Sequence, residues 1–273
     1  MGQRSQIYVV VVDKNGCKDL VVANYYQWNY GERMISRARG IVEWLQYYKE
    51  KNYLDFFMDN RLGSYKKRLS CIVDTNFDMR DIAISHNILK EVEEFVVSEQ
   101  KKNPDFKATP ECFRDVVFDG QDNNDGQLYI QVSPAEIKYA FTGYEVDSKP
   151  MTADEYIIWD DCDGRDLDEE EKDIMKNNVA FIEENAALMS QEELTEFKNF
   201  EYPVVKEFIK KNSKPQKRIN EERLLEILLE YISDDESNAC DPWYVLEKLQ
   251  QICTKEEMEE LGFSYLLDLK EEE

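Results

Sequence analysis

The sequence predicts an α+β fold in which an N-terminal sheet with covering helices is followed by an acidic, all-α C-terminal region. Up to about residue 150, strand-like runs alternate with amphipathic helical segments. From Thr152 onward, helix-start signals recur and the strand patterns stop. Most of the net negative charge lies in the same C-terminal part. We therefore predict two domains, an α+β domain at residues 1–150 and an acidic helical domain at residues 151–273.

A β-hairpin is predicted to open the chain. Two β-rich runs, Gln6–Asp13 and Lys18–Tyr25, flank the sequence Asp13-Lys14-Asn15-Gly16, whose Asn-Gly pair suits a tight turn. The run Ile7–Val12 is continuously apolar, which indicates that both faces of the first strand are covered. We therefore place this strand centrally in the sheet.

The least generic stretch is residues 24–45, where aromatic residues, arginines and glycines occur together. After Gly31 the apolar residues recur at helical spacing, which predicts a helix from Glu32 to about Tyr48 with one buried face. We place Arg33 and Arg37 on the opposite face near the helix start, where backbone N–H groups favour an anion. They form a candidate phosphate or carboxylate clamp. The alternative is a pair of salt-bridging surface arginines, because no glycine-rich phosphate loop precedes the helix.

The remaining elements of the first part follow from periodicity and turn residues. A second hairpin is predicted from two β-rich runs that flank a polar loop. The predicted elements are a continuation at Tyr53–Met58, strands at Leu69–Val73 and Asp81–Ser85, a helix from Asn87 to about Glu99, the hairpin Phe113–Phe118 and Gln127–Val132 around the loop Asp119–Gly126, and a strand at Ile137–Phe141.

The C-terminal part carries repeated helix-start signals. Capping boxes are expected where Thr152, Ser190 and Thr254 are each followed three residues later by a glutamate. We predict a helical bundle or stacked helical hairpins. The predicted helices are Asp168–Leu188, Gln191–Lys211 interrupted near Pro203, Glu221–Ile232, Trp243–Cys253 and Lys255–Leu261.

The charge distribution restricts the class of partner. The 273 residues carry a formal net charge of −24. Residues 1–150 contain 20 Lys+Arg and 23 Asp+Glu, a net of −3, whereas residues 151–273 contain 14 and 35, a net of −21. Such a field repels nucleic acid and membrane surfaces and attracts basic partners. We expect no direct binding to either, and the absence of a long apolar run or a signal pattern predicts a soluble, cytoplasmic protein.

Metal and cofactor chemistry receive no support from the sequence. The loop Asp119–Gly126 is rich in oxygen ligands, but its register places Asn124 where a calcium-binding EF-hand needs glycine. The six cysteines form no CxxC pair, and His86 is the only histidine. We therefore predict no metal site, no cofactor and no catalytic residue.

One weak nuclease pattern is present. Asp105, Glu136 and Lys138 resemble the spaced acids and lysine with which PD-(D/E)xK nucleases hold a divalent ion and position water. Three common residues make a weak signature, and the acidic chain would repel its own substrate. A nuclease is therefore the least favoured enzymatic interpretation.

Five stretches carry distinctive motifs over roughly the first 160 residues: Gly2–Val9, Asn24–Arg39, Asp74–Met79, Gln121–Leu128 and the pair Glu155-Tyr156. Together they resemble a family of uncharacterised acidic proteins found on prophages and mobile elements of Gram-positive bacteria. The resemblance implies no catalytic residues. It implies a genomic setting among accessory genes that often counter host defences, including anti-CRISPR genes.

These observations lead to a functional hypothesis of a non-enzymatic DNA mimic. Its partner would be a basic nucleic-acid-binding protein such as an RNA-guided nuclease or a restriction enzyme. DNA presents about one charge per 1.7 Å of axis, and an α-helix rises about 1.5 Å per residue, so acidic helices can imitate a phosphate row. The candidate partner-binding residues are Asp166, Asp168, Glu169, Glu170, Glu171, Asp173, Glu192, Glu193, Glu196, Asp234, Asp235, Glu236, Glu256, Glu257, Glu259 and Glu260.

Two other functional classes remain open. The acidic surface can simply keep the protein soluble, or the helical part can act as a scaffold that binds a partner without inhibiting it. The N-terminal α+β domain can also be a module or enzyme that binds a small anionic ligand through Arg33 and Arg37.

Overall fold

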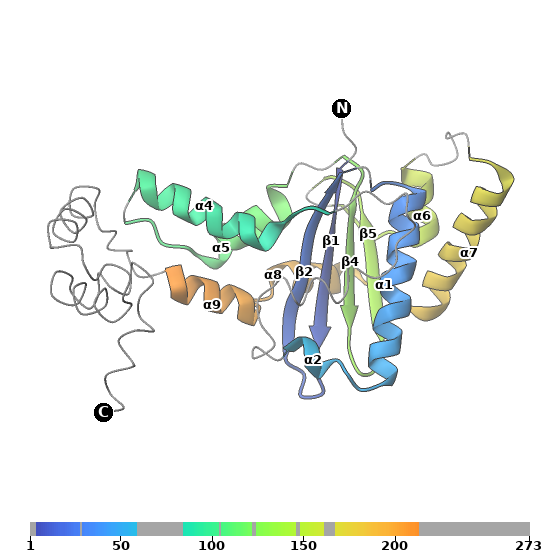
Figure 1. Ribbon diagram of the computed structural model, residues 1–273, viewed down its shortest axis with the longest axis horizontal. Helices are drawn as coiled ribbons and strands as arrows, with labels where there is room; N and C mark the ends of the chain where they lie inside the picture. Colours follow the sequence, from blue (N-terminus) through green and yellow to red (C-terminus); the bar gives the residue numbers. More distant parts are fainter. Residues whose placement is uncertain are drawn as a thin grey trace, which may run out of the picture. The chain divides into compact units, whose positions relative to one another are not determined.

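The computed structural model describes residues 4–27, 29–58, 84–103, 105–121, 124–145, 148–160 and 167–212. All of them belong to one compact unit, Met1–Lys214. Within these residues six strands form one mixed sheet in the order β3-β2-β1-β4-β5-β6, and helices cover both of its faces (Figure 1). The predicted α+β class is confirmed for this part of the chain. The strand predicted at Leu69–Val73 and the three helices predicted after residue 220 lie outside the described residues.

The strands are β1 Arg4–Val12, β2 Lys18–Gln27, β3 Ile84–Asn87, β4 Gln127–Val132, β5 Ile137–Thr142 and β6 Ala187–Leu188. The helical elements are α1 Glu32–Glu50, α2 Asp55–Met58, α4 Ile88–Lys102, α5 Pro110–Arg114, the π-helix η2 Asp115–Asp119, α6 Ala153–Trp159, α7 Glu169–Asn185, α8 Gln191–Asn199 and α9 Pro203–Asn212. None of these helices combines the length and apolar character needed to cross a membrane.

The N-terminal hairpin is confirmed. β1 pairs antiparallel with β2, and the Asp13 side chain accepts hydrogen bonds from the backbone N–H groups of Asn15 and Cys17, both at 2.8 Å. Gly16 closes the turn with φ 79°, a conformation that glycine adopts without steric cost. β1 lies between β2 and β4, as its continuous apolar sequence predicted.

The second predicted hairpin is wrong. Its first arm, Phe113–Phe118, is helical and spans α5 and η2. The hydroxyl of Thr109 accepts a hydrogen bond from the Cys112 N–H at 3.2 Å, and Pro110 occupies the first turn. This start signal overrides the β-rich composition that follows. The second arm is β4, which pairs parallel with β1 and antiparallel with β5.

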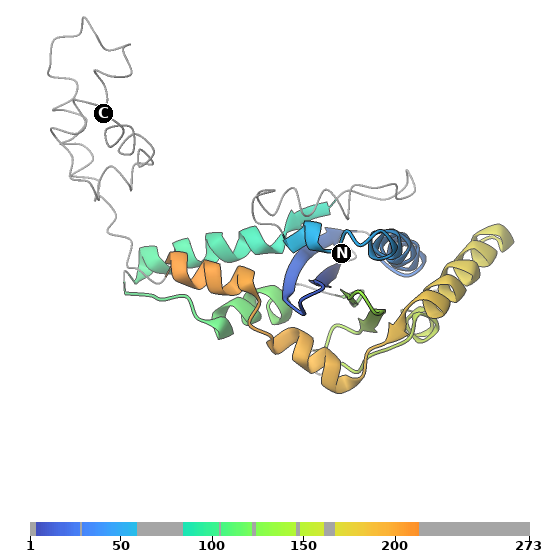
Figure 2. The same cartoon turned by 90° about the horizontal axis from the view of Figure 1, so that it is seen from below.

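Alternate side chains of the central strands enter two separate cores. Ile7, Val9 and Val11 of β1 belong to the core beneath α1, α6 and α7. Tyr8 and Val10 belong to the core on the other face, which α4, α5, η2, α8 and α9 cover. Figure 2 shows α1 and α8 on opposite sides of the sheet. The fold therefore has three layers, with the sheet in the middle.

The segment after residue 150 packs directly on this sheet. Met175, Val179 and Ile182 of α7 join the core beneath α1, and β6 pairs with β5. Leu194 and Phe197 of α8 join the opposite core. The predicted boundary at residues 150/151 thus falls inside the compact unit Met1–Lys214, and helices α6 to α9 cover the sheet instead of packing only on each other.

Local helix signals in this segment predicted the structure well. The capping boxes of Thr152 with Glu155 and Ser190 with Glu193 are both confirmed. Pro203 begins α9, so the interruption predicted there separates two helices. The box predicted at Thr254 lies outside the described residues.

Candidate functional site

Two of the predicted partner-binding acids on α8 hold this helix against the sheet. Glu193 Oε1 lies 2.5 Å from Lys138 Nζ on β5, and Lys138 Nζ also lies 3.0 Å from Glu136 Oε1. Glu196 forms an ion pair with Lys18 at the start of β2. The hydrogen bond from Lys138 holds the pKa of Glu193 below its ordinary value. Glu193 is half-buried, whereas Glu196 and Glu192 are both exposed.

The start of α7 presents an exposed group of carboxylates. We call Asp168, Glu169, Glu170 and Asp173 the acidic turn of α7; all four are exposed. Asp168 Oδ1 accepts a hydrogen bond from the Glu171 N–H at 2.8 Å, and the Glu171 side chain accepts from the Asp168 N–H at 3.1 Å. This capping box and the helix dipole both stabilise negative charge at the helix start.

Positive charge reduces the field of the acidic turn only in part. Lys172 Nζ lies 3.1 Å from Glu169 Oε1 in an i,i+3 pair on the helix surface. Exposed pairs of this kind contribute little and are screened by salt. The turn thus keeps a net negative charge toward solvent.

The acidic residues of α7 and α8 do not form one continuous row within the described residues. α7 packs on the sheet face that α1 covers, and α8 packs on the opposite face. A partner that contacts the acidic turn of α7 therefore does not reach Glu192 on the same flat surface. The other predicted acids lie outside the described residues: Asp166, Asp234, Asp235, Glu236, Glu256, Glu257, Glu259 and Glu260.

The predicted exposure of Arg37 is wrong. Its side chain is buried, with 3% relative exposure. The Nε group donates to Asn29 Oδ1 at 3.0 Å, and the guanidinium carbon lies 4.5 Å from the centre of the Tyr26 ring. Arg33 is partly exposed and lies 5.3 Å from the Tyr30 ring. The two arginines therefore point to different surroundings and do not form a shared surface clamp.

Arg37 completes a buried polar cluster where β1 begins and α1 starts. Ser5 Oγ donates to the Asn29 carbonyl at 2.5 Å, and Asn29 Nδ2 donates to Ser5 Oγ at 3.0 Å. Ser5 and Asn29 are also buried. Hydrogen bonds of this kind compensate for removing polar groups from water. The cluster ties the helix start to the sheet, which is a structural role.

The polar loop before β4 also has a structural role. The Arg4 N–H donates to Asn124 Oδ1 at 2.8 Å and to the Asp125 carboxylate. The N–H groups of Asn124 and Asp125 both donate to the Arg4 carbonyl, at 3.2 and 3.0 Å. Tyr156 Oη donates to the Asp125 carbonyl at 2.8 Å. The oxygen-rich residues thus fix the start of β1 beside β4.

The residues of the weak nuclease pattern have different structural settings. Asp105 lies in the turn between α4 and α5, whereas Glu136 and Lys138 lie at the start of β5 and pair with each other. No group of three or more His, Cys, Asp or Glu residues in the described part of the chain could hold a metal ion. His86 lies in β3, opposite Tyr25 of β2.

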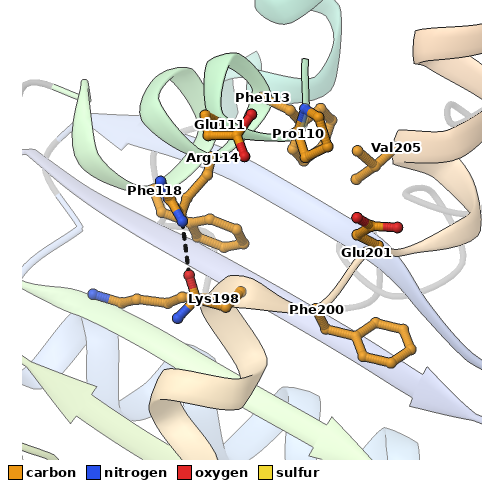
Figure 3. Close-up of a pocket in the computed structure, with 10 residues that line it drawn as sticks. Pro110, Glu111, Phe113, Arg114, Phe118, Lys198, Phe200, Glu201 and Val205 are labelled. Atoms are coloured by element: carbon orange, nitrogen blue, oxygen red, sulfur yellow. Dashed lines mark hydrogen bonds between the residues drawn. The ribbon is translucent and has the colours of Figure 1, made fainter.

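A pocket of about 150 Å³ lies between the α5–η2 segment and the junction of α8 and α9 (Figure 3). Arg114 Nη1 donates to Asn199 Oδ1 at 2.9 Å. The lining contains two cations, Arg114 and Lys198, and two carboxylates, Glu111 and Glu201. Their formal charges cancel, so this pocket has no preference for an anion.

The π-helix beside this pocket is anchored by side chains from other elements. Tyr8 Oη donates to the Val117 carbonyl at 2.6 Å, and Gln127 Nε2 donates to the Phe118 carbonyl at 3.1 Å. Burial raises the pKa of Tyr8 well above its ordinary value, so this hydroxyl stays a donor. The last carbonyls of a helix have no donor within the helix, and these side chains satisfy two of them.

A second pocket, of about 260 Å³, lies where β5 ends and α6 ends, and we call it the aromatic pocket. The Tyr144 and Trp159 rings stand 6.0 Å apart, centre to centre. Trp159 lies against a glycine backbone, because a Cβ atom on Gly143 would be 3.0 Å from its ring. The residues that line the aromatic pocket are Gly143, Tyr144, Glu145, Ser148, Lys149, Met151 and Trp159.

Sequence reasoning missed both pockets, because their residues come from segments that only the fold brings together. The aromatic pocket had one local signal, the pair Ile158-Trp159 at the end of an acidic helix. No known protein family, no curated protein and no solved structure matches this chain.

Proposed function

We propose that this protein is a non-catalytic inhibitor of a host nucleic-acid-targeting defence enzyme, of anti-CRISPR or anti-restriction type, and that it binds a basic groove of that enzyme. The acidic turn of α7 carries this proposal. It offers four exposed carboxylates at a helix start, within a region that has a net charge of −21 over residues 151–273. A field of this sign attracts a basic surface and speeds its encounter.

The acidic turn is smaller than the surface expected from the sequence. Glu193 and Glu196 form ion pairs with lysines of the sheet, so the charge that α8 presents is partly neutralised. The axial rise per residue of an α-helix, about 1.5 Å, is close to the length of duplex DNA axis per phosphate charge, about 1.7 Å. The proposed contact is therefore a short imitation of a few phosphates around the start of α7.

The alternative of a small anionic ligand bound in the N-terminal part receives less support. Arg37 is buried and donates to Asn29, which removes one arm of the expected clamp. The pocket beside Arg114 has balanced charge. A nuclease receives the least support, because Lys138 is held between Glu136 and Glu193.

The test is inhibition of DNA cleavage by purified enzymes, namely an RNA-guided nuclease and a restriction enzyme of a Gram-positive host. We compare the wild-type chain with the double variant Glu169→Lys/Glu170→Lys. We expect inhibition at low salt that weakens as ionic strength rises, because counterion screening acts on exposed charges. The double variant should lose inhibitory potency by about tenfold or more.

A matched control changes the same charge at the other end of the same helix. Glu183→Lys/Glu184→Lys adds identical charge at two exposed positions and should alter inhibition by less than about twofold. Circular dichroism of both variants checks that α7 remains helical. Equal losses in the two variants would show that net charge alone matters, and no inhibition of either enzyme by the wild-type chain would refute the proposed function.

A further inference from the structure

We infer that the aromatic pocket is the apolar centre of this interface and receives one apolar side chain of the basic partner, a step that rests on the proposed function. The first support is the location of exposed apolar surface. Tyr144, Ile158 and Ile174 have relative exposures of 59%, 67% and 49%. They lie on the β5–α6 connection, α6 and α7, and Ile174 directly follows Asp173 of the acidic turn in the sequence. Tyr144 lines the aromatic pocket, and exposed apolar groups at a pocket mark interaction sites.

One wall of the pocket, the Trp159 ring, is held in place by the core. The Trp159 ring stacks on the Tyr156 ring at 5.9 Å, and Tyr156 stacks on Phe141 at 4.6 Å. Tyr156 and Phe141 are fully buried in the core. A side chain held by the core loses little freedom when it binds, so such aromatic residues act as interface anchors.

The chemistry of the lining favours an apolar occupant over a cation. Glu145 and Lys149 are the charged residues of the lining, and their formal charges cancel. The walls are the rings of Tyr144 and Trp159 together with Met151. An apolar cavity of about 150 Å³ accommodates benzene, and the aromatic pocket is larger, at about 260 Å³. A leucine, methionine or phenylalanine side chain therefore fits it.

Acidic residues near the pocket favour a partner whose apolar side chain is surrounded by basic residues. Asp154 and Glu155 are exposed on the first turn of α6, one helical turn before Ile158 and Trp159. α7 also begins at the end of the sheet where β5 ends (Figure 1). An apolar centre with a charged rim is the usual organisation of a protein interface. The partner surface that fits is one apolar residue surrounded by lysines or arginines.

The experiment uses the full chain and two labelled nonapeptides. One has a central phenylalanine between two runs of four lysines, and the other has serine in its place. Fluorescence anisotropy measures Kd at about 0.15 M and at about 0.5 M NaCl, where the screening length shortens. We expect the phenylalanine peptide to bind about tenfold more tightly, because it buries an aromatic ring. The ratio of the two Kd values should stay the same at the higher salt concentration.

The variants separate the pocket from the acidic turn. Tyr144→Ser, which changes a residue of the pocket lining, should reduce the ratio of the two Kd values to below about threefold. Tyr144 is more than half exposed, so this change does not remove core packing. Tyr53→Ser is the matched control, because Tyr53 is 53% exposed and lies beside α2. This variant should leave the ratio of the two Kd values unchanged. Glu169→Lys/Glu170→Lys should raise the Kd of both peptides by the same factor.

Three outcomes would contradict parts of this scheme separately. Equal, salt-sensitive binding of the two peptides would overturn the role of the aromatic pocket and leave the acidic turn in place. A preference for phenylalanine that persists in Glu169→Lys/Glu170→Lys, with no loss of affinity, would overturn the acidic turn and keep the pocket. No binding of either peptide at low salt would overturn both.

Discussion

Lys138 on β5 donates a hydrogen bond to Glu193 on α8 at 2.5 Å, across 55 residues of sequence. This contact joins β5, the strand next to the edge strand β6, to a helix that we predicted to belong to a separate acidic domain. Glu193 also completes the capping box of α8, where its carboxylate accepts from the Ser190 N–H at 2.9 Å. One carboxylate therefore fixes both the start of the helix and its position on the sheet.

Glu193→Gln should lower the free energy of unfolding by about 0.5 kcal/mol at neutral pH, since partly exposed ion pairs contribute little. The pKa of Glu193 is lowered from 4.5, first by the Lys138 hydrogen bond. A lowered pKa stabilises the fold above the ordinary value, and that contribution is lost as pH falls through the folded-state value. The difference between wild type and variant in urea denaturation should therefore vanish in acid. Glu184→Gln, at an exposed position of α7, is the control and should change nothing at either pH.

Arg37→Met should destabilise the protein by about 2 kcal/mol or more, because it leaves the side-chain oxygen Oδ1 of buried Asn29 without its charged donor. Arg33→Met should cost less than about 1 kcal/mol, since its contact with Tyr30 is partly exposed. Urea denaturation followed by circular dichroism measures both changes. Similar stabilities for the two variants would contradict the structural role assigned to Arg37.

Gly126→Ala should cost at least about 2 kcal/mol more than Gly16→Ala, because only the first creates overpacking. Both glycines have positive φ, 86° and 79°, so the backbone strain of an alanine is similar. A Cβ atom at Gly126 would lie 2.5 Å from the Thr142 carbonyl oxygen, whereas at Gly16 nothing lies within 4 Å. Thermal unfolding of the pair isolates the effect of close packing. An equal Tm for the two variants would refute it.

Tyr8→Phe should lower the free energy of unfolding by about 1–3 kcal/mol, because the Val117 carbonyl of the π-helix loses its donor inside the core. Tyr144→Phe removes an exposed hydroxyl and should have no effect. Since burial raises the pKa of Tyr8, the folded state favours the neutral phenol. Its contribution is complete below the ordinary value of 10.0 and is lost as pH rises beyond it. Ultraviolet titration should show Tyr8 ionising only when the protein unfolds.

Local signals predicted the elements that depend on neighbouring residues. The Asn-Gly turn, the apolar stripe after Gly31 and the Ser190 capping box each act within a few residues. They appear in the structure as the β1–β2 hairpin, α1 and α8. In these cases tertiary packing agrees with local preference.

Long-range pairing could not be predicted in the same way. β4 was expected to pair with Phe113–Phe118, but it lies beside β1. Thr109-Pro110 is a helix-start signal. The prediction gave more weight to the β-rich composition of Phe113–Phe118. The parallel partner of a strand depends on chain topology, for which a single sequence carries no local signal.

The candidate site shows the same limit. Arg37 follows Met34 by three residues and precedes Ile41 by four, so its spacing already places it on the buried stripe. The sequence prediction placed Arg37 on the exposed face. In the structure its side chain is buried and donates a hydrogen bond to Asn29. The aromatic pocket depends on Gly143 and Trp159, which come together only because α6 returns onto β5.

The parallel register of β1 with β4 places Gln6 opposite Gln127 and Val11 opposite Val132. During synthesis, β2 follows β1 at once, whereas β4 is made about 100 residues after β2. At ribosomal rates of about 5–20 residues per second, this delay is roughly 5–20 s. For that time one edge of a valine-rich hairpin has no strand to pair with, and such edges recruit other chains. The nascent protein should therefore depend on chaperone cover until residue 132 has left the ribosome.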